Sequence, residues 1–289
     1  LRVVLERKVG FHELPKQVRI VAAANPPDLM VGGWELSPPL RNRFIHLQWD
    51  ISTEQYVRAI DEGWDKGIFP KINPSLHAEL LPEWKVKIAA FLKISPNMLH
   101  ASPEENNYGF ASPRTWDFAA HLLAACEILD IAPITGESGT TTCVELLSGC
   151  LGEGITVAFM EFLKNMRLPN PADVLDGKQE LQISDLDDSE LYIIFNTLGR
   201  TLENRFDQAI LVPSALKYFD LTTEVFKDGR RDLIYVSLKK ISRKGLLMKA
   251  MAMTQKHAPE DTPQIMSAIN ELFKDEGLRE FIEVFENEA

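Results

Sequence analysis

The sequence predicts a mostly α-helical protein with a small α/β part near its N-terminus. Two short apolar runs, Ile20 to Ala24 and Ile45 to Leu47, indicate strands, and the first is apolar on both faces, as in a sheet covered by helices. Beyond Pro171 the apolar residues instead recur at helical spacing. The clearest such stripe is Leu191, Ile194, Phe195, Leu198 and Leu202.

Turn and hairpin signals fill in the first 50 residues. Residues 1–7 look like the end of a helix, and Arg7 to Leu14 like a short hairpin with Gly10 at its turn. The Pro26-Pro27 pair ends the first predicted strand. Asn25 is therefore expected at the C-terminal tip of that strand, where it would present one polar amide.

Capping signals predict the helices of the middle region. Ser52 and Gln55 form a capping box, Pro82 suits the first turn of a helix, and Ser112 before Pro113 is the best helix start in the chain. The helices expected here are 53–64, 83–94, 113–129, 142–151 and 155–165.

A proline-rich stretch, Leu168 to Pro171, is the clearest linker candidate. The expected domains are residues 1–50, a small α/β part; 51–170, a helical part; and 171–289, a helical C-terminal domain. Further helices are expected in the last domain at 214–226, 231–243, 246–254, 263–273 and 278–285.

The composition is that of an ordinary globular protein. Of the 289 residues, 45% are hydrophobic and 25% charged, and the formal net charge of -11 argues against a dedicated nucleic-acid binder. The three cysteines, Cys126, Cys143 and Cys150, show no CxxC spacing, and no His/Cys cluster in the sequence supplies the four ligands of a structural zinc site. They predict buried free thiols in a reducing, cytoplasmic compartment. No apolar run is long enough to span a membrane.

Three residues have chemistry suited to a phosphate ligand. Asn25 carries an amide that both donates and accepts, Arg43 a permanent planar cation, and Arg114 lies in the first turn of a capped helix, which favours anions. Each has a plainer interpretation. Asn25 is a turn residue, Arg43 belongs to a solvated surface, and Arg114 pairs with Asp117.

The order of these segments resembles the MoxR-like branch of the AAA+ ATPases, over residues 1–171. The matching segments are Leu1 to Gly10 (the helix and hairpin that follow the Walker B acid), Ala22 to Pro26 (sensor 1), Leu40 to Phe44 (arginine finger), Ser112 to Thr115 (sensor 2) and Gly152 to Leu168 (end of the lid).

The resemblance implies a ring-forming enzyme, hexameric in the complete protein, that uses ATP and magnesium and remodels a protein client. Asn25 would act on the γ-phosphate in cis and Arg43 in trans, with Arg41 as an alternative finger. Arg41 and Arg114 would be nucleotide contacts.

The sequence departs from this family in two places. Residues 1–289 contain no GxxxxGK[ST] loop and no strand that ends in Asp-Glu. The resemblance therefore implies a nucleotide-binding half upstream of Leu1, and we expect the chain to be a fragment that does not bind ATP alone. Two alternatives remain open. One is a non-enzymatic helical interaction module on a degenerate AAA+ scaffold, and the other is a magnesium-chelatase-type motor subunit.

Overall fold

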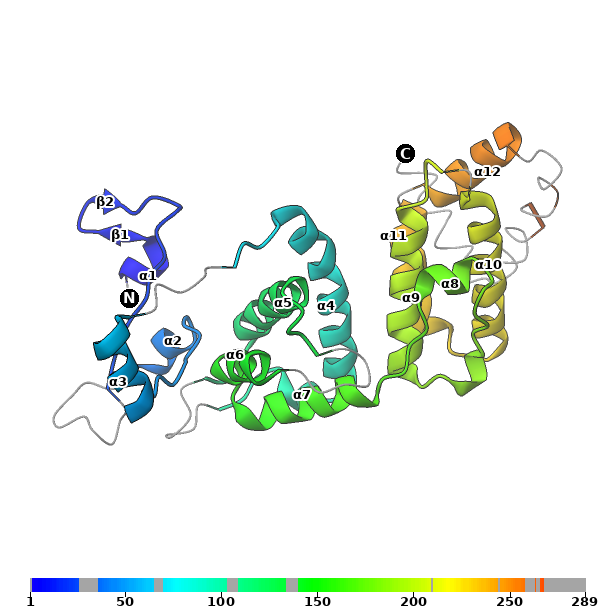
Figure 1. The fold of residues 1–289 in the computed structure, drawn as a ribbon. Helices are drawn as coiled ribbons and strands as arrows, with labels where there is room; N and C mark the ends of the chain where they lie inside the picture. The colour runs from blue at the N-terminus through cyan, green and yellow to red at the C-terminus, as the bar shows by residue number, and fades with distance from the viewer. Residues whose placement is uncertain are drawn as a thin grey trace. The chain divides into compact units, whose positions relative to one another are not determined.

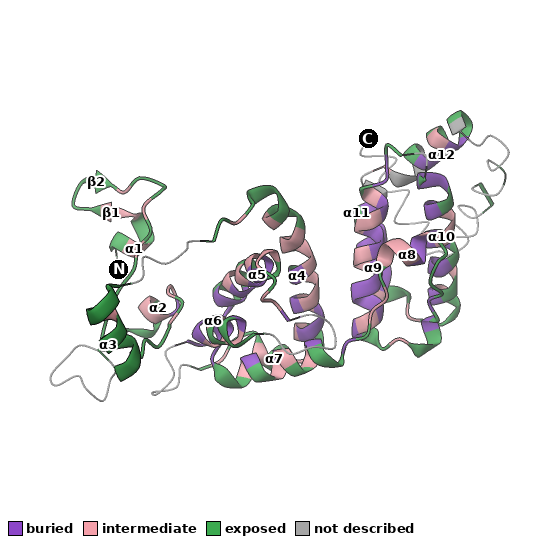
Figure 2. Ribbon diagram, in the orientation of Figure 1, coloured by how far each residue is buried: buried purple, intermediate pink, exposed green. Residues whose placement is uncertain are grey.

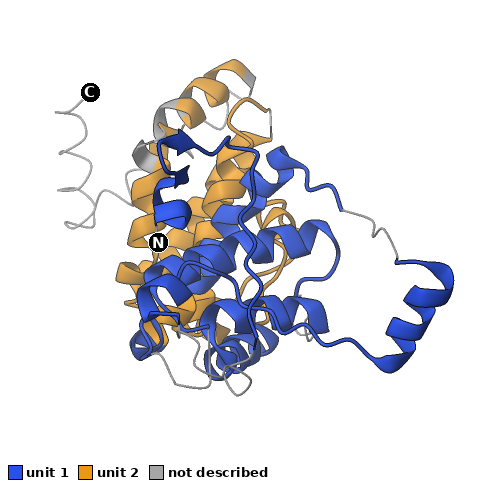
Figure 3. Ribbon diagram, turned by 90° about the vertical axis from the view of Figure 1, so that its left-hand side faces the viewer, with its two compact units in different colours: residues 1–88, 95–165 blue, residues 89–94, 166–289 orange. Residues whose placement is uncertain are grey.

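A computed structural model describes residues 2–25, 36–64, 70–102, 109–133, 140–208, 210–243 and 245–257, together with 263, 266 and 267. Within these residues the chain is mostly helical and has one small two-stranded sheet (Figure 1). It forms two compact units (Figure 3). Unit 1 comprises residues 1–88 and 95–165, and unit 2 comprises residues 89–94 and 166–289.

Unit 1 begins with helix α1 (Arg2–Glu6) and an antiparallel hairpin of β1 (Lys8–Val9) and β2 (His12–Glu13). Gly10 has a φ of 62°, a left-handed conformation that glycine adopts without steric cost, which confirms the predicted turn. Arg7 stabilises the base of the hairpin, since its Nη2 donates hydrogen bonds to the carbonyl oxygens of Pro15 (2.9 Å) and Val18 (2.7 Å).

The two predicted strands are not formed. Residues 18–25 and 45–50 have no regular secondary structure, and Val21, expected at the centre of a buried strand, is 89% exposed. The reason is that a strand is stable only beside another strand. Within residues 2–25 and 36–64 the structure shows no strand apart from β1 and β2, so neither apolar run has a neighbour to pair with.

The predicted helices of unit 1 are present. They are α2 (Pro38–Arg41), α3 (Thr53–Glu62), α4 (Pro74–Ile94), whose last six residues belong to unit 2, α5 (Pro113–Ile128), α6 (Thr141–Leu151) and α7 (Glu153–Asn165), with a short 3₁₀ turn η2 (Pro96–Met98). The predicted capping box at Ser52 is confirmed, and Ser112, predicted as a helix N-cap, also forms a capping box.

The start of α4 was predicted wrongly. The sequence indicated a beginning near Glu83 because Pro82 suits a first turn, but Pro82 lies inside the helix. The helix instead begins after Asn73, whose Oδ1 accepts hydrogen bonds from the amides of Ser75 (3.0 Å) and Leu76 (3.4 Å). The sequence signal at Asn73, a side chain that caps a helix start, was overlooked in favour of the proline.

The core of unit 1 lies among α4, α5, α6 and α7 (Figure 2). Trp84 of α4 is buried, and its indole N–H donates to Glu127 Oε2 at 2.6 Å. Trp116 of α5 packs edge-to-face on Phe159 of α7, with 5.4 Å between ring centroids. The predicted state of the cysteines is confirmed, as Cys126, Cys143 and Cys150 are buried and free.

Unit 2 is a bundle of helices with one continuous core. Its elements are α8 (Pro171–Leu175), the 3₁₀ turn η3 (Ile183–Asp185), α9 (Asp188–Glu203), α10 (Leu211–Lys227), α11 (Arg231–Arg243) and α12 (Leu246–His257). All five residues of the predicted stripe on α9 are buried. Gly199 lets α11 lie close to α9, because a Cβ there would lie 2.5 Å from Ile241 Cδ1. The predicted helices 263–273 and 278–285 lie almost entirely outside the described residues.

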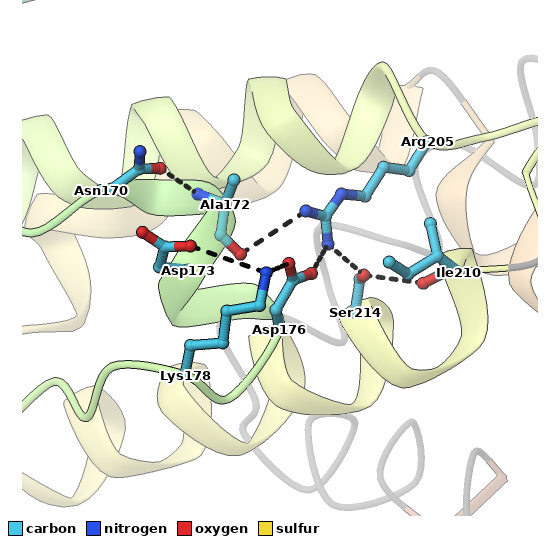
Figure 4. Close-up of polar contacts among 8 residues, drawn as sticks. All are labelled: Asn170, Ala172, Asp173, Asp176, Lys178, Arg205, Ile210 and Ser214. Carbon is cyan, nitrogen blue, oxygen red and sulfur yellow. Dashed lines mark hydrogen bonds and ion pairs between the residues drawn. The ribbon is translucent and has the colours of Figure 1, made fainter.

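A polar network joins α8 to α10 in unit 2 (Figure 4). The buried guanidinium of Arg205 lies 2.8 Å from Asp176 Oδ1 and donates to Ser214 Oγ at 2.6 Å. Lys178 pairs with the other oxygen of the Asp176 carboxylate at 2.9 Å. These cations hold the pKa of Asp176 below its usual range, with the Lys178 hydrogen bond as the largest cause. The network is structural, because every charge in it already has a partner.

None of the helices in the described part of the chain has the length and apolar character needed to cross a membrane.

Candidate functional site

The two arginine-bearing motifs, about 70 residues apart in sequence, meet at Asn42. This residue follows α2 directly and is only 7% exposed. Its Nδ2 donates to the carbonyl oxygen of Phe110 at 3.2 Å. Its Oδ1 accepts from Ser112 Oγ at 2.7 Å and from Arg114 Nη1 at 3.3 Å. The side chain of Asn42 thus joins the arginine loop, defined here as residues 38–46, to the start of α5.

The start of α5 is rigid because several hydrogen bonds fix it. Ser112 caps the helix, accepting from the amide of Thr115 at 3.2 Å, while Thr115 Oγ1 accepts from the amide of Ser112 at 2.8 Å. Thr115 Oγ1 also lies 3.0 Å from the carbonyl oxygen of Phe110, to which it donates. The Phe110 carbonyl oxygen therefore accepts hydrogen bonds from both Thr115 and Asn42, so the arginine loop and α5 are bound to the same backbone atom.

The far end of the arginine loop is bound to α6 through backbone atoms. The amide of His46 donates to the carbonyl oxygen of Gly149 at 3.0 Å. A Cβ at position 149 would lie 2.0 Å from the carbonyl oxygen of His46, and a Cβ at Gly109 would lie 2.7 Å from that of Gly149. Three stretches of backbone therefore pack against one another at a spacing that only glycine permits.

His46 also stabilises the loop internally. Its Nε2 donates to the carbonyl oxygen of Arg41 at 2.8 Å. Burial lowers the pKa of His46 below 6.5; the hydrogen bond to Arg41 raises it and the Arg41 charge lowers it further. The ring is consequently neutral at pH 7, which suits a donor beside a guanidinium.

The arginines are held in different ways. The Arg41 guanidinium lies 6.0 Å from the centroid of the Phe110 ring, and Arg43 donates through Nη1 to the carbonyl oxygen of Pro39, in its own loop. The Nε atoms of both are buried, and neither has a hydrogen-bond partner among the described residues. Arg114 is exposed. Such permanent cations can receive an anion but can perform no proton transfer.

The structure decides between some of the plainer interpretations. Asp117 does not pair with Arg114; its carboxylate lies 2.7 Å from Lys85 Nζ, and this contact lowers its pKa. The arginine loop is solvated only in part: Asn42 at its centre is buried and Arg41 and Arg43 are half-buried. The structure does not bring Asn25 to the cluster. It lies in an exposed irregular segment with no hydrogen bond to the arginine loop or to α5 among the described residues.

Sequence reasoning missed the residues that hold the cluster together. Asn42 stands between the two arginines and was passed over because its neighbours carry the charge. Gly149 gave no signal, since a glycine inside a helical pattern does not say which backbone approaches it.

Within the described residues, no group of three or more His, Cys, Asp or Glu side chains is placed to hold a metal ion. Comparison with known proteins does not extend these observations: no family model, no curated protein and no solved structure matches the chain.

Proposed function

We propose that the chain is part of a ring-forming ATPase of MoxR-like AAA+ type, in which ATP hydrolysis is coupled to remodelling of a partner protein. The observation that supports this most directly is the Asn42 bridge. It brings the finger-like motif, with Arg41 and Arg43, to the helix start that carries Arg114. Phosphoryl transfer requires positive charge held near the transferring phosphate, and this cluster offers three permanent cations.

The proposed roles follow from the chemistry of each group. Arg43 would stabilise the γ-phosphate bound to a neighbouring subunit, once its side chain leaves the carbonyl of Pro39. Arg41 is the alternative for that role. Arg114 would contact a phosphate at the N-terminal end of α5, where the helix dipole favours an anion. Asn25 would orient water.

The described residues do not suit the whole ATP–magnesium complex. The sequence has no phosphate-binding loop, and the described part shows no group of three or more His, Cys, Asp or Glu side chains placed to hold a metal ion. We therefore assign to this chain only contacts to phosphate oxygen, and derive no step through the metal. The proposal requires that the reading frame encode a P-loop and an Asp-Glu strand before Leu1. Sequencing that region is the first check.

The decisive test uses the complete protein. Arg43→Ala should leave nucleotide binding intact and lower ATP turnover by a factor on the order of 10³ or more, as removal of an arginine finger does. Arg58→Ala is a matched control, since Arg58 is exposed on α3, outside the cluster. Normal turnover of Arg43→Ala would transfer the finger role to Arg41. Normal turnover of both Arg43→Ala and Arg41→Ala would refute the assignment of an arginine finger to this loop.

One observation favours a second candidate, a helical interaction module without nucleotide chemistry. Asn25 lies in an exposed irregular segment instead of at a strand tip, so the proposed water-orienting group is not preorganised here. The reading frame separates the two candidates. A P-loop and an Asp-Glu strand before Leu1 would support the first, and absence of a P-loop from the reading frame would support the second. Micromolar binding of ATP to residues 1–289 alone would contradict both, since neither expects this chain to bind the nucleotide by itself. A magnesium-chelatase-type motor would share the cluster and differ in substrate.

A further inference from the structure

The arginine loop is fastened to the helices of unit 1 at three points. Asn42 bonds to Phe110 and to the first turn of α5, the amide of His46 bonds to Gly149 of α6, and Arg41 lies over the Phe110 ring. A displacement of α5 and α6 would therefore move the loop with them. The position of Arg43 depends on these helices.

One of these attachments involves a group that a ligand would compete for. Arg114 donates to Asn42 Oδ1 at 3.3 Å, a longer bond than the 2.7 Å bond from Ser112 to the same oxygen. Arg114 is exposed, so a phosphate group can reach its guanidinium. A charged phosphate oxygen is a stronger acceptor than an amide oxygen. Phosphate binding would accordingly draw Arg114 away from Asn42.

We propose that Asn42 is a positioning residue that couples the occupancy of Arg114 by a phosphate group to the placement of the arginine loop. This inference rests on the proposed function. With Arg114 free of phosphate, the side-chain amide of Asn42 binds three groups: the Phe110 carbonyl, the Ser112 hydroxyl and the Arg114 guanidinium. With phosphate on Arg114, one contact is lost and the loop relaxes. Linkage requires the reverse effect too, so the position of the loop sets the phosphate affinity of Arg114.

The test is the steady-state ATP turnover of the complete protein with substitutions at position 42. Asn42→Ala removes the competitor for Arg114, so KM should fall, and it releases the loop, so kcat should fall as well. Coupling of this kind is commonly worth roughly five-fold or more. Asn42→Asp replaces the amide by a carboxylate that pairs more strongly with Arg114, so KM should rise. Asn165→Ala, at the exposed end of α7, is the control and should change neither constant.

The opposite shifts of KM separate coupling from a merely structural role, because a fall in the folded fraction lowers the apparent kcat without moving KM in either direction. In an Arg114→Ala background the two substitutions at position 42 should no longer alter KM. KM shifts that persist in that background, or an unchanged KM in both single variants, would overturn the inference. The proposed function fails separately, if the unsubstituted protein does not hydrolyse ATP or if neither Arg41 nor Arg43 affects turnover.

Discussion

The N-terminal 64 residues and the helices of unit 2 contain similar apolar side chains but bury them very differently (Figure 2). Among the described residues up to Trp64, only Asn42 is buried, while Phe11, Trp49 and Ile60 are exposed. In unit 2 the apolar stripe of α9 is buried against α10 and α11. Apolar character alone therefore does not produce a core; a surface of matching shape is required. In the N-terminal stretch the one buried contact is polar, and it is the contact that holds the candidate site.

The largest difference between the two regions should appear on truncation of matched leucines. Leu198→Ala removes a fully buried side chain from α9 and should lower the free energy of unfolding by about 2–5 kcal/mol. Leu47→Ala makes the same chemical change where the side chain is exposed, so an effect within about 0.5 kcal/mol is expected. Urea denaturation measures both. Equal effects would mean that Leu47 packs against something in solution.

A smaller effect is expected from a methyl group placed at the backbone contact. Gly149→Ala would set a Cβ against the carbonyl of His46 and force the arginine loop away from α6. Overpacking of this kind costs about 1–3 kcal/mol. Gly154→Ala on α7 meets nothing within contact distance and provides the control. Thermal unfolding gives the comparison, and a Gly149→Ala protein as stable as the parent would disprove the close approach.

The two capping boxes allow the same substitution, serine to alanine at an N-cap, to be compared between the N-terminal stretch and the core of unit 1. Ser112→Ala removes the cap of a helix that belongs to the core, and should lower stability by about 0.5–2 kcal/mol. Ser52→Ala removes the same cap from α3, which has no buried residue. Loss of that cap should reduce local helicity and leave the unfolding midpoint of the core unchanged. If Ser52→Ala lowered the global stability as Ser112→Ala does, α3 would have to pack against the core.

The smallest predicted effect concerns pH. The pKa of His46 is lowered in the folded protein, mainly by burial, so the unfolded chain binds more protons near its ordinary pKa of 6.5. The stabilising effect of the neutral ring is complete above pH 6.5, and it is lost as the pH falls from there towards the folded pKa. His46→Gln keeps a donor for the Arg41 carbonyl and should reduce this slope between pH 7 and 5. If the dependence of stability on pH were unchanged, it would come from other groups. One such group is His121, because burial also lowers its pKa.

The helices were well predicted because their signals are local. Ser52, Ser112 and the stripe on α9 each specify a cap or a face through neighbours fewer than a dozen residues away, and all three predictions are confirmed. The strands were predicted wrongly because a strand depends on a partner distant in sequence. Residues 20–24 have strand-like composition, but composition does not supply the neighbouring strand.

The candidate site was predictable only in part for the same reason. The sequence identified Arg41, Arg43 and Arg114 as cations suited to phosphate, but their convergence depends on hydrogen bonds from Asn42 to residues 110–114. The residues next to Asn42 in the sequence do not indicate those contacts. Asn25 was predicted from its place after a strand, so when the strand proved absent the reason for placing it in the site was lost.

The contact between Gly149 and His46 has a consequence for how variation in this protein would be interpreted. It joins main-chain atoms, so the identity of the side chain at position 46 matters little to it, while position 149 tolerates no side chain at all. As far as this contact is concerned, position 46 would accept any residue that keeps its backbone N–H, while position 149 would be restricted to glycine. Methods that infer proximity from paired substitutions would not detect it, because only one partner can vary.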